Sequence, residues 1–145
     1  MHRSYAWEYR IEIPPYDKVV DVLEAFFASY PQGDYTCERR EQFRLEFRRG
    51  LWKKSYLGFG QLVPERLVKG QFNRWPILVR VLARPSPSVF TITVRYEVHL
   101  PKSVPSLTPE VQSSVNLYAR KELDDLTAYL AECADLDKRP TVVAL

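Results

Sequence analysis

The segment from Phe90 to Leu100 alternates strictly between apolar and polar residues, and this alternation constrains the fold more than any other feature of the chain. Successive side chains of a β-strand point to opposite faces, so the pattern predicts a long strand with one buried face and one wet face. The apolar run from Ile77 to Leu82 precedes it across a turn rich in proline and serine. We expect these two strands to pair as an antiparallel hairpin.

Three further segments are predicted to be strands. Residues 7–13 alternate between large apolar and charged side chains, and Pro14-Pro15 ends this strand because proline cannot donate to a sheet ladder. Residues 35–49 form a long predicted strand. In its first half, the charged residues Arg39 and Glu41 occupy the alternate positions that are apolar in the second half. A bulge or a solvent-exposed first half would produce this mismatch. Residues 56–63 are predicted to be a short, glycine-containing strand.

Two segments have helical periodicity. Apolar residues between Val19 and Tyr30 recur on one helical stripe. Thr108-Pro109-Glu110 is a helix start signal, and that helix is predicted to run to about Cys133. The sequence therefore predicts an α+β fold: a twisted antiparallel sheet of four to five strands, with both helices packed on its apolar face.

Length and composition fit a single domain. A chain of 145 residues that is 46% hydrophobic can form one packed core. We expect residues 1–134 to form this domain and residues 135–145 to be a tail, either frayed or added to the sheet as an edge segment. There is no apolar run of bilayer-spanning length, and the charged N-terminal segment is unlike a secretory signal, so the expected location is the cytoplasm.

The last predicted helix carries one charged residue within its apolar stripe. Glu122 lies one turn after Tyr118 and one turn before Leu126. A buried carboxylate must find a partner or lose its charge. One interpretation is a ligand-binding cleft between helix and sheet, formed by Glu122, Tyr118, Phe90 and Tyr96. The alternative is a structural ion pair between Glu122 and an arginine at the margin of helix and sheet, for which the candidates are Arg10, Arg80 and Arg95.

A second candidate site is the basic–aromatic segment, residues 39–56, which holds seven basic residues. Its expected surface-binding residues are Arg48, Arg49, Trp52, Lys53, Lys54 and Tyr56. Basic side chains neutralise phosphates and aromatic rings stack on bases, and the same features suit an anionic membrane surface or an acidic protein. Glu41 and Glu46 interrupt the segment and Glu38 directly precedes it, so the alternative is the wet face of an amphipathic strand followed by a turn. A net charge of +3 permits nucleic-acid binding without requiring it.

The chain carries no recognisable catalytic set. Its histidines, His2 and His99, have no spacing relation to Cys37 or Cys133 that suggests a nucleophile and its base. The two cysteines are far apart and lack metal-ligand spacing, and a disulfide is not expected. We therefore predict no enzymatic activity, no metal and no cofactor.

Three short pieces carry a resemblance to known proteins: Phe47-Arg48-Arg49-Gly50, the run from Trp75 to Val81, and the pattern from Tyr118 to Leu130. They resemble segments of small uncharacterised bacterial α+β proteins, and the order of elements is similar to that of helix-grip domains. The resemblance implies an antiparallel sheet capped by a C-terminal helix. The helix-grip comparison also implies a hydrophobic ligand.

Three functional hypotheses follow. The preferred one is a non-enzymatic binding or protein-interaction module. The first alternative is a carrier of a small hydrophobic ligand, because the many inner-face aromatic residues either line a cavity or fill the core. The second is binding to nucleic acid or an anionic surface through the basic–aromatic segment. An exposed edge strand at residues 56–63 would also allow a homodimer.

Overall fold

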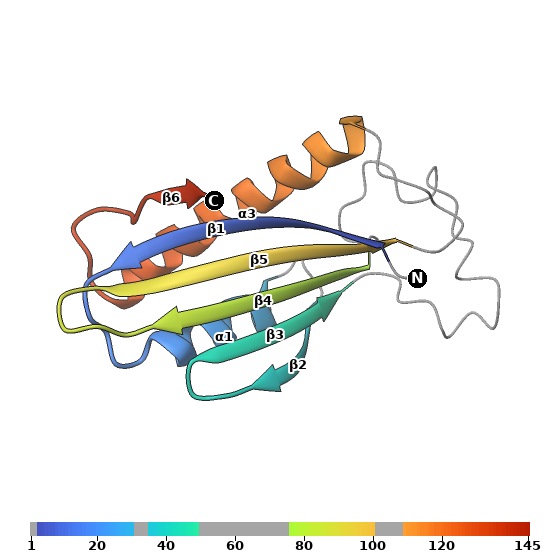
Figure 1. The fold of residues 1–145 in the computed structure, drawn as a ribbon. Coiled ribbons are helices and arrows are strands. Elements are labelled where there is room, and N and C mark those ends of the chain that lie inside the picture. Colours follow the sequence, from blue (N-terminus) through green and yellow to red (C-terminus); the bar gives the residue numbers. More distant parts are fainter. Residues whose placement is uncertain (1–2, 31–34, 50–75, 101–108) are drawn as a thin grey trace.

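The computed structural model of the chain describes residues 3–30, 35–49, 76–100 and 109–145 (Figure 1). The elements in chain order are β1 (Arg3–Ile13), α1 (Val19–Ser29), β2 (Thr36–Arg40), β3 (Arg44–Arg49), β4 (Ile77–Arg84), β5 (Phe90–Leu100), α3 (Pro109–Cys133) and β6 (Val142–Ala144). The strands form a six-stranded sheet in the order β2-β3-β4-β5-β1-β6, and every neighbouring pair is antiparallel. The predicted α+β class is confirmed, with one strand more than the expected maximum.

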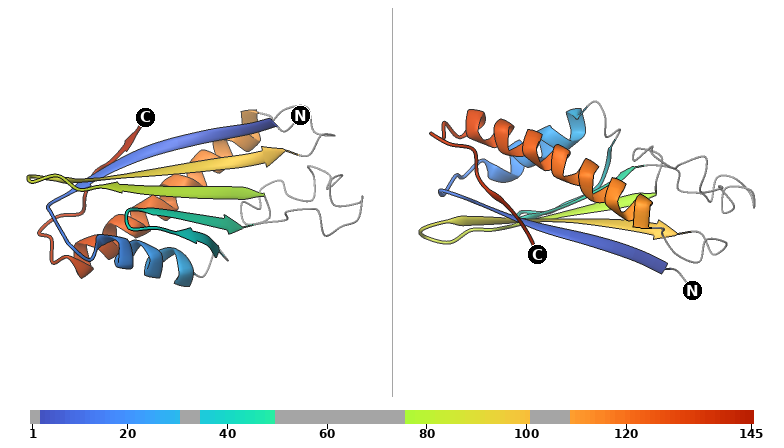
Figure 2. Two further views of the ribbon diagram at one scale, coloured as in Figure 1. Left: turned by 60° about the horizontal axis from the view of Figure 1, so that its bottom comes forward. Right: turned by 90° about the horizontal axis from the view of Figure 1, so that it is seen from above.

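Both helices cover the same face of the sheet, as predicted (Figure 2). The opposite face is covered by no element of the described part of the chain. This arrangement explains the strict alternation in the strands, because one side chain in two enters the core beneath the helices. None of the described helices combines the length and the apolar character that a membrane span requires.

The longest pairing in the sheet is regular throughout. β1 and β5 pair without a register shift over eleven positions, from Arg3 opposite Leu100 to Ile13 opposite Phe90. β4 and β5 form the predicted hairpin. The C-terminal segment adds a short strand, since β6 pairs with β1 at residues 9–11. Of the two expectations for residues 135–145, the structure therefore has the added edge segment.

The segment 35–49 corrects one prediction, because it folds as the hairpin β2–β3 and not as one long strand. The turn closes with a bond from the Glu41 amide to the Arg44 carbonyl, at 2.8 Å. The expected irregularity is present as a register shift between Cys37 and Arg39. Beyond this shift, Arg40 forms ion pairs with two residues of α1, Asp21 and Glu24, the second at 3.4 Å. The predicted strand at 56–63 lies outside the described residues.

The aromatic residues of the inner face are packed against one another. The Phe27 ring lies 5.1 Å from the Phe47 ring and 5.4 Å from the Tyr35 ring, measured between centroids. Phe27 and Phe47 are completely buried. Interlocking rings of this kind fill a core with shape-specific contacts. Phe27, Phe47 and Tyr35 therefore serve as core.

Candidate functional site

The structure places Glu122 at the centre of a buried polar cluster between α3 and the sheet. We call Glu122, Arg49, Tyr35 and Tyr96 the Glu122 cluster. The Tyr35 and Tyr96 hydroxyls both donate to Oε1 of Glu122, at 2.5 Å and 2.8 Å. Nη1 of Arg49 lies 3.4 Å from Oε2 of Glu122, and these two side chains are only 1% and 3% exposed. Every oxygen of the carboxylate thus has a partner from the sheet side of the core.

The electrostatics of the Glu122 cluster follow from its burial. Desolvation raises the pKa of Glu122 above its ordinary value, while the Arg49 guanidinium and the two hydroxyl donors oppose that rise. Burial, reinforced by the Glu122 carboxylate, raises the pKa of Tyr35 and of Tyr96 well above the ordinary tyrosine value. Both hydroxyls therefore stay protonated and remain hydrogen-bond donors. The Arg49 guanidinium also stacks 4.6 Å above the centre of the Tyr35 ring.

The arginine that neutralises Glu122 is not among the three candidates expected from the sequence. Arg80 and Arg95 both point to Glu97 on the open face, with Nε–Oε2 distances of 3.1 Å and 2.9 Å. Arg10 pairs with Glu12, a neighbour on its own strand. The sequence feature that identifies Arg49 is the alternation of side chains along β3. Arg49 occupies the same alternate positions as Leu45 and Phe47, and the side chains at these positions point into the core.

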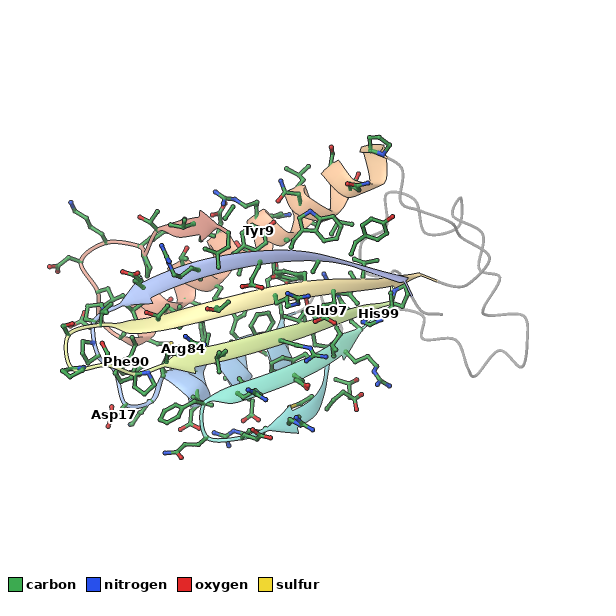
Figure 3. The ribbon with its side chains drawn as sticks, in the orientation of Figure 1. Tyr9, Asp17, Arg84, Phe90, Glu97 and His99 are labelled. Carbon is green, nitrogen blue, oxygen red and sulfur yellow. The ribbon has the colours of Figure 1, made fainter. Side chains whose placement is uncertain are left out.

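The other residues of the predicted cleft do not join Glu122. Tyr118 is 40% exposed on α3. Phe90 lies at the end of β5 beside the β4–β5 turn, far along the sheet from Glu97 and from its buried neighbour Tyr96 (Figure 3). Of the four predicted members, the structure therefore brings together only Glu122 and Tyr96.

Most arginines in the described part of the basic–aromatic segment pair with nearby acids. Arg39 pairs with Glu41 at 3.7 Å, and Arg48 pairs with Glu38 at 3.7 Å. Arg49, expected at the surface, is buried in the Glu122 cluster. Trp52, Lys53, Lys54 and Tyr56 lie outside the described residues. In the part of the chain that the structure describes, no three histidine, cysteine, aspartate or glutamate side chains converge as a metal site would require.

A second site, which the sequence did not predict, lies at the outer edge of β1. A groove of about 380 Å³ opens between β1, the end of β6 and the N-terminal half of α3. We call it the β1 groove. It is lined by Ala6, Trp7, Glu8, Tyr9, Arg95, Asn116, Ala144 and Leu145. Its volume is within the range of small-ligand and peptide side-chain sites.

The hydrogen bonds of β1 show which of its backbone groups face the groove. The Leu145 amide donates to the Glu8 carbonyl at 2.9 Å, so the even-numbered residues of β1 turn their backbone groups toward the β6 edge. On this side of β1, the described pairing with β6 covers residues 9–11. The N–H and C=O groups of Ala6 and Ser4 therefore face outward in the line that β6 has begun.

The side chains of the β1 groove combine aromatic walls with fixed polar groups. On the α3 side, the Tyr9 hydroxyl donates to Oδ1 of Asn116, and the Arg120 guanidinium lies 5.9 Å from the centre of the Tyr9 ring. On the open face, Nη1 of Arg95 lies 3.1 Å from Oε2 of Glu8. The groove is thus part apolar and part charged, and along one wall runs a stretch of β1 that pairs with no other described strand on that side.

Comparison with known proteins identifies no relative, since no protein-family model matches the chain and no curated protein is significantly similar to it.

Proposed function

We propose that this protein is a non-enzymatic interaction module that binds an extended peptide along the outer edge of β1. The observation that carries the proposal is the position of the β1 groove, where β6 ends and the outward backbone groups of Ser4 and Ala6 begin. A peptide strand entering there continues the line of β6 and gains main-chain hydrogen bonds at once. Binding by strand addition obtains affinity from such bonds and specificity from pockets for alternate side chains.

The contrast between the two edges of the sheet supports this choice of surface. At one edge, β2 is short, carries Glu38, Arg39 and Arg40, and contains a register shift. Charge, shortness and bulges are the devices by which proteins block unwanted pairing of an edge strand. In β1, by contrast, Tyr5, Ala6 and Trp7 are uncharged and continue in regular register with β5.

The described interior argues against the two alternative functions. A carrier of a small hydrophobic ligand needs space between α3 and the sheet, but the Glu122 cluster and the packed rings around Phe27 occupy that layer. Of the five described basic residues in the segment 39–56, three pair with acids at the surface and Arg49 is buried. Both cysteines are free and exposed, which fits a reducing cytoplasm.

The experiment uses peptides selected from a displayed library of random dodecamers, titrated into the labelled protein and followed by NMR. We expect shifts of the amide signals of residues 3–8 and of the Asn116 side chain. Ala6→Pro removes one outward donor while leaving the β1–β5 ladder intact, because proline is tolerated at a strand edge. Glu12→Pro is the matched control, since Glu12 has the same backbone parity but lies beyond the other end of the β6 pairing.

Loss of binding in Ala6→Pro, with binding retained in Glu12→Pro, is the expected result. A backbone-N-methylated peptide gives the same test without changing the protein. Two results would overturn the proposal. One is selected peptides that bind Ala6→Pro as tightly as the parent protein. The other is a concentration-dependent dimer that Ala6→Pro abolishes, because a second copy would then be the occupant of this edge.

A further inference from the structure

The side chains around the β1 groove also specify which peptide fits, on the condition that the proposed strand addition is correct. Ala144 opposes Tyr9 and the Leu145 amide bonds to Glu8, so the next positions of an added strand oppose Trp7 and then Ala6. Residues directly opposite each other in an antiparallel pair share a face. The peptide residue opposite Trp7 therefore points toward α3, and the one opposite Ala6 points to the open face.

The position opposite Trp7 favours a large apolar side chain. Its surroundings are the Trp7 indole, the Tyr9 ring and the methyl group of Ala144, with Asn116 above. Tyr9 is held in place by its bond to Asn116, so the aromatic wall is already formed before a ligand arrives. A preformed aromatic wall with a small residue beside it receives an aromatic or branched aliphatic side chain without reorganisation.

The position opposite Ala6 favours a basic side chain. Ala6 is exposed and small, so a long side chain opposite it passes over β1 without obstruction. The nearest charged neighbour on that face is Glu8, which lies diagonally across from this position and within reach of a lysine or arginine. Glu8 uses Oε2 for Arg95, and its side chain is 35% exposed, which leaves the carboxylate open to a second cation. Glu97, directly across from Ala6 on β5, is already paired with Arg80 and Arg95 at 3.1 Å and 2.9 Å, so Glu8 is the acid that carries this preference.

We propose that the β1 groove recognises an extended segment in which a large apolar residue is followed directly by lysine or arginine. The order is set by the backbone, because the added strand runs antiparallel to β1 and meets Trp7 before Ala6. The partner is thus a protein segment with a basic–apolar alternation. The two recognised side chains of the peptide point to opposite faces of the sheet.

The probe is the blocked peptide Ac-Thr-Phe-Lys-Val-Thr-NH2, compared with versions carrying Gln or Glu for Lys, and Ala for Phe. We expect the Lys peptide to bind about twofold to fivefold more tightly than the Gln peptide, as exposed ion pairs do, with the difference shrinking at high salt. Replacing Phe with Ala is expected to weaken binding about tenfold. In Glu8→Gln, the preference for Lys is expected to vanish or to shift toward Glu, because Arg95 has lost its partner on β1.

The outcomes separate this inference from the proposed function. Equal affinities for the Lys, Gln and Glu peptides, or a preference for Lys that survives in Glu8→Gln, would refute the specificity while leaving strand addition intact. If none of the peptides shifts the amides of residues 3–8, strand addition itself fails and the specificity falls with it.

Discussion

The buried pair of Arg49 and Glu122 makes a sharp prediction about stability. In Glu122→Gln, the Arg49 guanidinium remains charged, because arginine is not deprotonated in proteins. Its side chain is 1% exposed, so water cannot replace the lost carboxylate. Breaking a buried ion pair from one side costs about 3–5 kcal/mol, a large share of the stability of a domain of this size. We therefore expect Glu122→Gln to be severely destabilised.

The opposite single variant is expected to cost less. In Arg49→Met, Glu122 can escape its unpaired charge by taking up a proton. At pH 7, protonating a carboxyl with an unfolded pKa of 4.5 costs about 2.5 × 1.36, or about 3.4 kcal/mol, which sets the upper limit. Met fills the space of the arginine stem, so little cavity cost is added.

The double variant Arg49→Met/Glu122→Gln is expected to recover most of the loss. Both charges are gone, and the Gln carbonyl oxygen still accepts the hydroxyls of Tyr35 and Tyr96. Replacing a buried ion pair by uncharged groups of similar shape is often close to neutral, so we expect a loss of about 1–2 kcal/mol. Urea unfolding followed by circular dichroism gives the four free energies of the cycle. The coupling energy is expected to be about 4–6 kcal/mol. Additive single effects would refute the claim that these two residues depend on each other.

Two further predictions concern the stability of the buried core. Burial raises the pKa of Glu122, so its contribution to stability is fully present below its unfolded pKa and is lost as the pH rises through the folded value. Arg49→Met should therefore gain stability relative to the parent protein as the pH falls from 7 towards 4.5, measured by urea midpoints. The double variant should show no such gain. Phe27→Ala should cost about 3–5 kcal/mol. Leu117→Ala, at a site 68% exposed, should change the melting temperature little, and an equal effect of both would contradict the assigned core.

The layout of the sheet was predictable because it depends on local periodicity. The alternation of β5 fixes both its length and its buried face, and the tight β4–β5 turn fixes its neighbour. The hairpin within residues 35–49 was missed because Glu41-Gln42-Phe43 contains neither glycine nor proline to mark the turn. β6 was foreseen only as one alternative, since three residues carry too little pattern to predict a strand.

The candidate sites could also be predicted only in part from the sequence. The helical stripe predicted that Glu122 is buried, and strand parity carried the information that Tyr96 and Arg49 point inward. Which arginine meets the carboxylate depends on how α3 lies across the sheet, and no local pattern encodes that. The β1 groove was missed for a related reason. It forms where β6, from the other end of the chain, pairs with β1 at residues 9–11, and no local pattern encodes the pairing of segments so far apart in sequence.

The two sites are joined by α3. Asn116, the polar wall of the β1 groove, precedes Glu122 by six residues, or about 9 Å along the helix axis. The Glu122 cluster fixes the middle of α3 to β5 and β3, and the Tyr9–Asn116 bond fixes the preceding turns to β1. A groove wall anchored at two points keeps its shape before a peptide arrives, which reduces the entropy lost on binding. Conversely, a variant that frees the middle of α3, such as Glu122→Gln, should weaken peptide binding without touching the groove. Arg49→Met/Glu122→Gln, which restores the packing, should recover it.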